Sequence, residues 1–428
     1  MEWVEMKGAL LFIGDELIAG RILNTNAEFA GKVFSATALK IQEILTIPDE
    51  EEIIIKTLRR LLEEYDFIIT SGGLGPTEDD ITVKALSKAF SLSLKEDEAL
   101  LSAIFSAKEY KGKEEMVRKM SFLPEGAILL DEEYRMLGFY LPLKNKKLFF
   151  LPGVPEQFEY LLEKKVLPLL CEVMDEKGLC REDKLLRSFI FFDLNETDLN
   201  YFIADLSNKE KIKIGYYPIF PEVKLVLFGE KEQVEELSQK IKERFKINLV
   251  SEKEESLNVV VGKILFERGL TLSTAESCTG GLLSSLITSV SGSSAYFERG
   301  FVTYSPESKR EILGISPETL ETKGIYSHET AQEMALGAKK ISKADFSLST
   351  TGIAGPTGGT PEHPVGTVFI GLATPKKVFS FHFHFTGDRN TIQRMASFTA
   401  LDILRRYILY GKGFFSYRFA KGVKEKAL

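Results

Sequence analysis

The chain has 428 residues, of which 44% are hydrophobic and 27% charged, so about three globular domains can each bury a core. Its 55 basic and 62 acidic residues give a net charge of -7, which argues against general binding to nucleic acid or to an anionic membrane. Three scattered cysteines argue against a disulfide framework or a zinc site, and without a signal or membrane-spanning stretch we expect a cytoplasmic protein.

The first part of the chain, residues 1–170, alternates short apolar strands with amphipathic stretches of helical length. Residues 8–13 and 66–70 are predicted strands, with an acidic helix at 50–64 between them, and another strand leads into a helix near 148–158. This alternation predicts an α/β domain with a mainly parallel sheet.

Two polar segments follow these strands, IGDELIAGRILNTNAEF and SGGLGPTEDDIT, at the strand ends where open α/β sheets bind ligands. Glycine backbone N–H groups can cradle a phosphate, and nearby carboxylates can hold a divalent metal against it. The simpler interpretation is that Asp79 and Asp80, the candidate metal ligands, only cap the following helix. The candidate residues are Asp15, Glu16, Gly72, Gly73, Gly75, Asp79 and Asp80.

Residues 171–255 show a different pattern from the first part of the chain: a strand, a helix, two strands and a helix. This order predicts a small α+β module that is KH-like. A KH domain clamps a nucleic-acid backbone with a G-x-x-G loop, and this region has none. We therefore expect a spacer or dimerisation module and no direct contact with nucleic acid.

A charged joint at 251–256 leads into the last domain, residues 256–428, which is again predicted to be α/β. Residues 411–428 carry more Lys and Arg than acidic residues and are predicted to form a solvated tail. The predicted helices are 257–269 and 391–409, and the predicted strands are 270–275, 345–351, 366–374 and 377–385.

The most informative segment is TAESCTGGLLSSLIT, residues 274–288, where a strand runs into a glycine-rich helix start. The first N–H groups of such a helix suit a phosphate or a developing oxyanion, although a serine there is often only a cap. Ser277 is the candidate nucleophile, and Cys278 is the alternative because a thiol is intrinsically more nucleophilic. The candidate substrate-binding residues of this turn are Thr279, Gly280 and Gly281.

The segment YSPESK predicts a second helix start, with Ser305 as N-cap and Pro306 in the first position. Lys309 then lies in the first turn, where the helix dipole and partial burial lower its pKa and let it accept a proton from a serine. The alternative is a solvated surface lysine. The four histidines lack metal-site spacing and no G-x-S-x-G elbow is present, so a Ser–Lys arrangement is the simplest chemistry for attack on an amide.

Two further loops complete this constellation, TTGIAGPTGGTPEHPVGT at 350–367 and FTGDR at 385–389. Glycines give the first loop the freedom to wrap a nucleotide, and Arg389 can clamp a phosphate or pair with a carboxylate. The candidate binding residues are Thr351, Gly352, Gly355 and Arg389.

In this order, AESCTGG, YSPESK, TGIAGPTGGTPEHPVGTV and FTGDR resemble the CinA family, specifically its C-terminal nicotinamide-mononucleotide deamidase domain, and the resemblance spans the chain. It implies a cofactor-free amidohydrolase of pyridine-nucleotide (NAD) salvage that converts nicotinamide mononucleotide to nicotinate mononucleotide and ammonia. It also implies a homodimer. The implied nucleophile is Ser277, with Lys309, Tyr304 and Ser294 as supporting polar groups. Family members usually have asparagine where this chain has Pro306, and proline cannot make the side-chain contacts of that asparagine.

The N-terminal motifs, with LPGVPEQF at 151–158, resemble the molybdopterin-binding fold that begins CinA proteins. In some members this domain is implicated in metal-dependent hydrolysis of ADP-ribose. A metal-dependent ADP-ribose pyrophosphatase or a molybdopterin-handling protein is therefore the alternative function, and a non-catalytic role in competence or DNA damage is a third. The chain departs from the pattern at 131–139, where Tyr134, Arg135 and Met136 replace small residues. By this resemblance the N-terminal site also includes Asn24, Asn26, Thr77 and Glu156.

Overall fold

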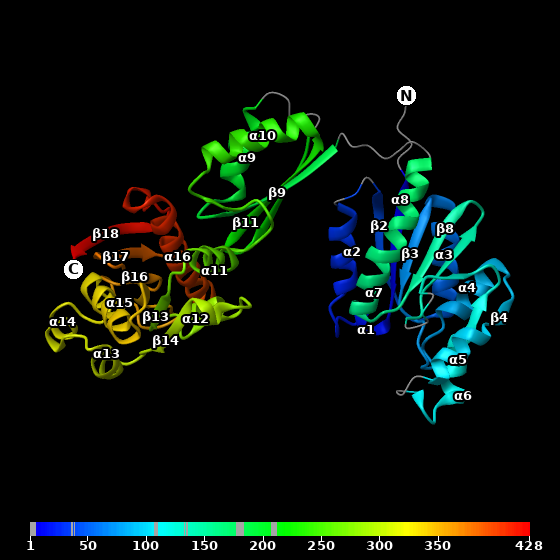
Figure 1. The fold of residues 1–428 in the computed structure, drawn as a ribbon, viewed down its shortest axis with the longest axis horizontal. Helices are drawn as coiled ribbons and strands as arrows, with labels where there is room; N and C mark the ends of the chain where they lie inside the picture. The colour runs from blue at the N-terminus through cyan, green and yellow to red at the C-terminus, as the bar shows by residue number, and fades with distance from the viewer. Residues whose placement is uncertain are drawn as a thin grey trace. The chain divides into compact units, whose positions relative to one another are not determined.

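The computed structural model describes residues 6–428 except 36, 38, 107–109, 132, 134–135, 177–183 and 207–211, so Tyr134, Arg135 and Cys180 lie outside the described residues. The chain forms two compact units, Met1–Glu182 and Asp183–Leu428 (Figure 1). The second unit holds both the middle module and the C-terminal domain, and the division into three domains at 170 and 255 stays a prediction. No helix of the described residues is long and apolar enough to cross a membrane.

The first unit is built on a six-stranded sheet in the order β2-β1-β3-β8-β7-β6. Its four parallel strands are β2 (Lys40–Ile47), β1 (Lys7–Ile13), β3 (Phe67–Ser71) and β8 (Lys146–Leu151). The antiparallel strands are β7 (Phe139–Leu143) and β6 (Ile128–Leu129), with a separate pair β4 (Leu94–Glu96) and β5 (Phe122–Pro124). The predicted α/β class with a mainly parallel sheet is confirmed.

Helices cover both faces of this sheet, because its central strands are apolar on both sides. In β1, Leu10 and Phe12 pack into one hydrophobic cluster, whereas Leu11 and Ile13 pack into the cluster on the opposite face. The helices of the first cluster are α2 (Thr25–Ser35), α7 (Pro155–Leu161) and α8 (Leu167–Glu176), joined to α7 by a π-helical turn at Leu162–Val166. Those of the second are α3 (Glu51–Glu64), α4 (Thr82–Phe90) and α5 (Glu98–Ser106). Shorter helical turns are α1 (Asp15–Ile18), α6 (Glu114–Val117) and Arg118–Ser121.

The second unit begins with an antiparallel sheet in the order β10-β11-β9-β12. Two helices cover one face of this sheet with a shared apolar core. The strands are β9 (Lys184–Phe192), β10 (Ile212–Ile219), β11 (Glu222–Glu230) and β12 (Leu249–Ser251), and the helices are α9 (Glu196–Ala204) and α10 (Lys231–Arg244). Ile190 and Phe192 face the other way and join the core of the C-terminal domain, so the two parts of this unit pack as one body.

The C-terminal domain is a six-stranded mixed sheet in the order β14-β13-β15-β16-β17-β18. Its parallel strands are β13 (Leu272–Glu276), β14 (Phe297–Val302) and β15 (Phe346–Gly352), and its antiparallel strands are β16 (Thr367–Ala373), β17 (Lys377–His384) and β18 (Ala420–Ala427). The helices on one face are α11 (Leu257–Glu267), α12 (Leu282–Thr288) and α16 (Arg389–Tyr410), and those on the other are α13 (Pro306–Leu313), α14 (Pro317–Thr322) and α15 (His328–Ser342).

The prediction of a solvated tail at 411–428 is wrong. Residues 420–427 form β18, which pairs antiparallel with β17. Three aromatic residues before it, Phe415, Tyr417 and Phe419, pack on the phenylalanines of β17 and the residue after it, with ring centroids 4.8, 5.7 and 6.0 Å apart. Burial of these rings outweighs the basic charge of the segment.

Helix α16 carries a buried charge cluster that fastens the two parts of the second unit. Asp402 is fully buried and pairs with Arg405 at 2.7 Å and with Arg406 at 2.6 Å. Arg405 also donates to the carbonyl oxygen of Ile247, two residues before β12, and to that of Leu249, the first residue of β12. Asp402 thus pairs with both buried guanidinium groups, and Arg406 also pairs with Asp193 at 3.4 Å.

We expect Asp402→Ala to lower the free energy of unfolding of the second unit by about 3 kcal/mol or more, because it removes the carboxylate partner of buried Arg405 and leaves buried Arg406 with the more distant carboxylate of Asp193. Urea unfolding followed by circular dichroism measures the change. The matched control is Glu236→Ala, which removes an ion pair between the exposed side chains of Glu236 and Lys240 and is expected to cost less than about 1 kcal/mol. Equal effects of the two substitutions would contradict this account of the cluster.

Candidate functional site

Ser277 lies directly after β13, at the carboxyl end of the parallel strands of the C-terminal sheet. Its backbone N–H donates to the carbonyl of Thr350 on β15 at 2.9 Å, which ties the turn to the neighbouring strand. Gly280 and Gly281 then adopt positive φ angles of 62° and 100°, and the chain turns into α12. The side chain of Ser277 is largely buried, with a relative exposure of 5%.

Lys309 reaches the same place from α13. The predicted helix start is confirmed: the Ser305 hydroxyl accepts a hydrogen bond from the N–H of Ser308, and Pro306 is in the first position. Lys309 follows in the first turn with its side chain directed into the protein, where only 1% of its surface is exposed.

The amine of Lys309 has three oxygen neighbours. Its Nζ lies 2.9 Å from Ser277 Oγ, 2.7 Å from the carbonyl oxygen of Thr303 and 3.1 Å from that of Tyr304. Burial lowers the pKa of Lys309 to about 8, because an ammonium ion loses solvation there. In the neutral form two N–H bonds serve the two carbonyls, and the lone pair is left for the proton of the Ser277 hydroxyl.

Cys278 is adjacent but poorly suited to the role of nucleophile. Its side chain is 4% exposed, and burial raises the pKa of its thiol to about 12. A thiol with that pKa contains almost no thiolate at neutral pH, and the thiolate is the reactive species.

The N–H groups at the start of α12 do not face an open site, contrary to the sequence-based expectation. The carboxylate of Glu276 accepts hydrogen bonds from the backbone N–H groups of Gly281, Leu283 and Ser284, at 2.8 to 3.0 Å. The hydroxyls of Thr279 and Ser284 also donate to it. Glu276 is not among the predicted site residues, although a glutamate at the end of a buried strand is a signal that could have identified it.

The remaining sequence motifs lie around Ser277 and Lys309. Arg389 donates to the carbonyl of Gly355 at 2.8 Å and to the hydroxyl of Tyr304 at 3.2 Å. Gln393, one turn further along α16, donates to the carbonyl of Cys278 at 2.7 Å. The structure thus joins the four sequence motifs around Ser277, and Gln393 is a further neighbour that these motifs do not predict.

Three other predicted binding residues have structural partners. The Thr279 hydroxyl bonds to Glu276 and also to the Thr350 hydroxyl at 2.7 Å. Thr351 is fully buried and donates to the carbonyl of Ile325. A Cβ on Gly352 would lie 2.4 Å from the carbonyl oxygen of Thr367, so this glycine permits close packing of β15 on β16.

Ser294 is a predicted site residue that the structure does not bring close to Ser277 and Lys309. It is exposed on a short helical turn, Ser293–Ala295, just before β14. Strand β14 runs parallel to β13, with Phe297 opposite Leu272 at the other end of the strand from Ser277. Ser294 therefore lies at the amino end of these strands, and Ser277 at their carboxyl end.

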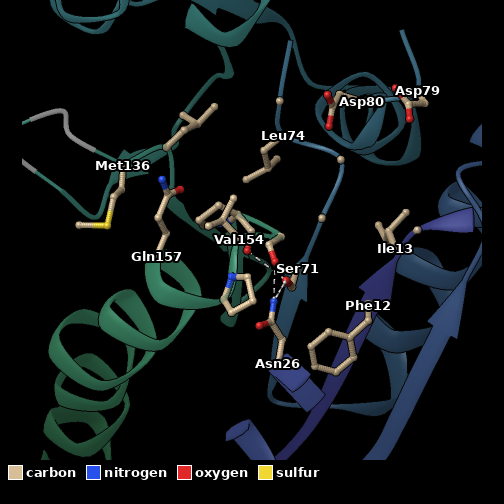
Figure 2. Close-up of a pocket in the computed structure, with 18 of the residues that line it drawn as sticks. Phe12, Ile13, Asn26, Ser71, Leu74, Asp79, Asp80, Met136, Val154 and Gln157 are labelled. Carbon is tan, nitrogen blue, oxygen red and sulfur yellow. Dashed lines mark hydrogen bonds between the residues drawn. The ribbon is translucent and has the colours of Figure 1, made fainter. Parts of the chain in front are cut away.

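The first unit contains a cavity of about 540 Å³ at the carboxyl ends of its strands, within the usual size range of ligand pockets. Figure 2 shows Asp79 and Asp80 on one side of it and Met136 on the other. Asn26 lies in its wall, where its side-chain amide donates to the Ser71 hydroxyl at 3.2 Å and to the carbonyl of Gly153 at 2.9 Å (Figure 2). Met136, at the point of departure from the family pattern, is part of the lining.

Glycine is required in the loop that borders this cavity. Gly72 has a φ of 108°, and a Cβ there would lie 2.2 Å from the carbonyl oxygen of Ile13. At Gly73, with a φ of 69°, a Cβ would lie 2.1 Å from the Thr82 hydroxyl oxygen. The backbone of the loop can therefore approach β1 and α4 closely only without side chains at these two positions.

The cavity is acidic. Its lining includes Glu16, Asp49, Asp79 and Asp80, and no Lys, Arg or His is among the described residues that line it. Burial, together with the carboxylates of Asp15, Glu16 and Asp79, raises the pKa of Asp49. Within the described part of the chain, no group of three or more His, Cys, Asp or Glu side chains is arranged to hold a metal ion.

Most predicted residues of this site line the cavity, and three do not. The Asp15 carboxylate accepts a hydrogen bond from the backbone N–H of Asp49, and the Thr77 hydroxyl donates to the Asp80 carboxylate at 2.6 Å. Glu156 is exposed on α7, while the next residue, Gln157, lines the cavity. The remaining predicted residues are in the lining: Glu16, Asn24, Asn26, Gly72, Gly73, Gly75, Asp79 and Asp80.

Comparison with known proteins gives two family matches. The family described as CinA C-terminal domain matches residues 254–408, and the family described as probable molybdopterin binding domain matches residues 9–172. A CinA-like protein of Desulfotalea psychrophila is 37% identical over 409 residues, covering 94% of this chain and 98% of the relative. A CinA-like protein of Geotalea uraniireducens is 36% identical over 415 residues, covering 94% of this chain and 98% of the relative. The crystal structure of a competence/damage inducible protein from Agrobacterium tumefaciens matches 35% of this chain and 92% of its own, with 42% identity and a TM-score of 0.34.

Proposed function

The chain belongs to the CinA family, and we propose that its C-terminal domain hydrolyses the carboxamide of nicotinamide mononucleotide to nicotinate mononucleotide and ammonia. The observation that carries the proposal is the buried contact of 2.9 Å between Lys309 Nζ and Ser277 Oγ. A serine needs a base to become a nucleophile, and this amine has a pKa low enough to serve near neutral pH.

In the first half of the proposed reaction, neutral Lys309 accepts the proton of the Ser277 hydroxyl while Oγ attacks the carboxamide carbon. The resulting tetrahedral oxyanion collapses with cleavage of the C–N bond, and the Lys309 ammonium gives its proton to the departing nitrogen, which leaves as ammonia. The product is an ester between Ser277 and the nicotinoyl group, and Lys309 is neutral again.

In the second half, Lys309 accepts a proton from a water molecule that attacks the ester carbon. Collapse of this intermediate breaks the bond to Oγ, and the proton returns from Lys309 to Ser277. Nicotinate mononucleotide leaves, so one water is consumed for each ammonia released. The carbonyls of Thr303 and Tyr304 keep the amine in place through both halves.

We assign the phosphate of the substrate to Arg389. Two of its N–H groups are used by Gly355 and Tyr304, and the remaining N–H groups of its exposed guanidinium are available to a phosphate. The exposed ring of Tyr304 lies beside it.

The direct test is release of ammonia from nicotinamide mononucleotide by the purified full-length protein, with nicotinate mononucleotide identified as the second product. Release of nicotinamide would instead indicate cleavage of the glycosidic bond and would remove the proposal.

The acidic cavity of the first unit favours a second activity, hydrolysis of the pyrophosphate of ADP-ribose with a divalent metal. Four carboxylates without a basic side chain in the described lining repel a phosphate unless a cation accompanies it. Asp79 and Asp80 would hold that ion, which often binds through one or two carboxylates and the phosphate itself. The metal would neutralise the phosphate charge.

We expect ADP-ribose to raise the melting temperature of the protein by about 5 °C at 100 times its dissociation constant when Mg²⁺ or Mn²⁺ is present, and to have little effect in EDTA. Asp79→Asn should reduce this shift. The matched control is Glu78→Gln, because Glu78 is exposed and does not line the cavity. A shift that is the same with and without metal would contradict the assignment.

Cytoplasmic location and a homodimer remain predictions. Size-exclusion chromatography with light scattering tests the second.

A further inference from the structure

We propose that Glu276 is a positioning residue, whose buried carboxylate fixes the turn that presents Ser277 Oγ to Lys309 and the next two backbone N–H groups to the substrate oxygen. The proposal rests on the amide hydrolysis proposed above. Glu276 does not touch Ser277 Oγ or Lys309 in the structure, so its effect is exerted through the backbone.

The carboxylate is completely enclosed and has five donors. Three are backbone N–H groups at the start of α12, and two are the hydroxyls of Thr279 and Ser284. Such a network is expensive to break in a buried site, since each donor would lose a charged acceptor. The residue therefore holds both ends of the turn 277–281 relative to each other.

The hydrogen bonds of Glu276 also determine which N–H groups remain for the reaction. Those of Gly281, Leu283 and Ser284 are used by the carboxylate, and that of Ser277 donates to Thr350. In the described part of the chain, the N–H groups of Cys278 and Thr279 donate to no oxygen. They directly follow the nucleophile, where acyl-transfer enzymes commonly place an oxyanion donor.

Only a carboxylate satisfies this arrangement. Both oxygens of Glu276 accept, Oε2 from Gly281, Leu283 and Thr279, and Oε1 from Ser284. A glutamine of the same shape would place an NH₂ group against backbone N–H groups on one side. The turn would then relax, while the contacts of Lys309 with Thr303 and Tyr304 would stay.

The test is Glu276→Gln in the full-length protein, with Glu298→Gln as the matched control. Glu298 is an exposed residue of β14 that pairs with Arg299, so its substitution makes the same change of charge outside the site. Two rates are measured per folded molecule: ammonia release, and covalent labelling of Ser277 by a fluorophosphonate, in which the Oγ–P bond forms and fluoride leaves.

We expect Glu276→Gln to lower both rates about 100-fold, the usual effect of a lost oxyanion donor, with KM changed less than about threefold. The pH midpoint of labelling should stay near that of the wild type, because Lys309 remains buried beside the carbonyls of Thr303 and Tyr304. A purely structural role would lower the melting temperature and leave the rates per folded molecule unaltered.

A folded Glu276→Gln protein that is labelled at the wild-type rate overturns the proposal. If that protein does not fold, Ser284→Ala is the deciding variant, because it removes one hydroxyl donor to Glu276, along with a contact to the Thr274 hydroxyl, and leaves the carboxylate in place. A rate about five times lower supports the proposal, and an unchanged rate overturns it. Labelling does not require nicotinamide mononucleotide, so the two proposals can fail separately. A wild-type protein that is labelled but releases no ammonia would refute the proposed function, and the role of Glu276 would then be tested by labelling alone. A wild-type protein that is never labelled at Ser277 would refute the positioning role.

Discussion

Replacing Ser277 with alanine is expected to lower ammonia release from nicotinamide mononucleotide by about 10⁴-fold or more. The substitution removes the only atom that lies within hydrogen-bond distance of the Lys309 amine and can form an ester with the substrate, among the described residues. The measurement is a coupled ammonia assay at saturating substrate, with the product identified by mass spectrometry.

The neighbouring thiol provides the control. Cys278→Ala should keep at least about a third of the wild-type rate, because its pKa of about 12 leaves it protonated and its role is to fill space. The opposite pattern, a silent Cys278→Ala protein and an active Ser277→Ala protein, would assign catalysis to the cysteine.

The second large effect concerns Lys309. In the wild type, the rate should rise about tenfold per pH unit between pH 6 and 7.5 and level off above pH 8.5, because only the neutral amine accepts the serine proton and its pKa is about 8. Lys309→Met keeps most of the side-chain volume and removes the amine, and we expect a loss of about 10³-fold together with the loss of this pH dependence.

Lys323→Met, at an exposed position after α14, is the matched control and should leave both rate and pH profile unchanged. A Lys309→Met protein that keeps the rise around pH 8 would show that another group titrates, and the proposed base would then be wrong.

Local sequence rules were enough to place Lys309. The succession Ser305-Pro306 determines where α13 begins, and a helix that begins there puts residue 309 in the first turn, four residues after the cap. These rules do not predict the distance between Lys309 and Ser277. That distance depends on the parallel pairing of β13 with β14, which brings the turn after β13 beside the segment after β14.

Glu276 and Ser294 show the limits of the same approach. In sequence, a glycine-rich helix start is typical of an anion-binding site. The structure shows instead that the carboxylate of Glu276 accepts hydrogen bonds from the N–H groups of this helix start. Ser294 follows Ser277 closely in sequence, but the intervening helix α12 carries the chain back to the opposite end of the sheet, where β14 begins. Sequence proximity therefore did not predict proximity in space.

The basic charge of residues 411–428 predicts a solvated tail, whereas the spacing of their aromatic residues is typical of a strand. Phe415, Tyr417 and Phe419 recur at every second residue, which is the spacing that puts side chains on one face of an extended chain. Their contacts with Phe381, Phe383 and Phe385 show that this face is buried.

Strand β18 also bears on how the protein behaves when it is concentrated. Without it, β17 would expose a row of unpaired backbone groups beside a cluster of phenylalanine rings, a surface on which strands of other molecules can add and begin to aggregate. The new edge that β18 presents carries Lys421 and Lys426, together with Lys424, which pairs with Glu329. Lysines on an edge strand oppose such growth. The last residues of the chain therefore act as a barrier against self-association along the sheet.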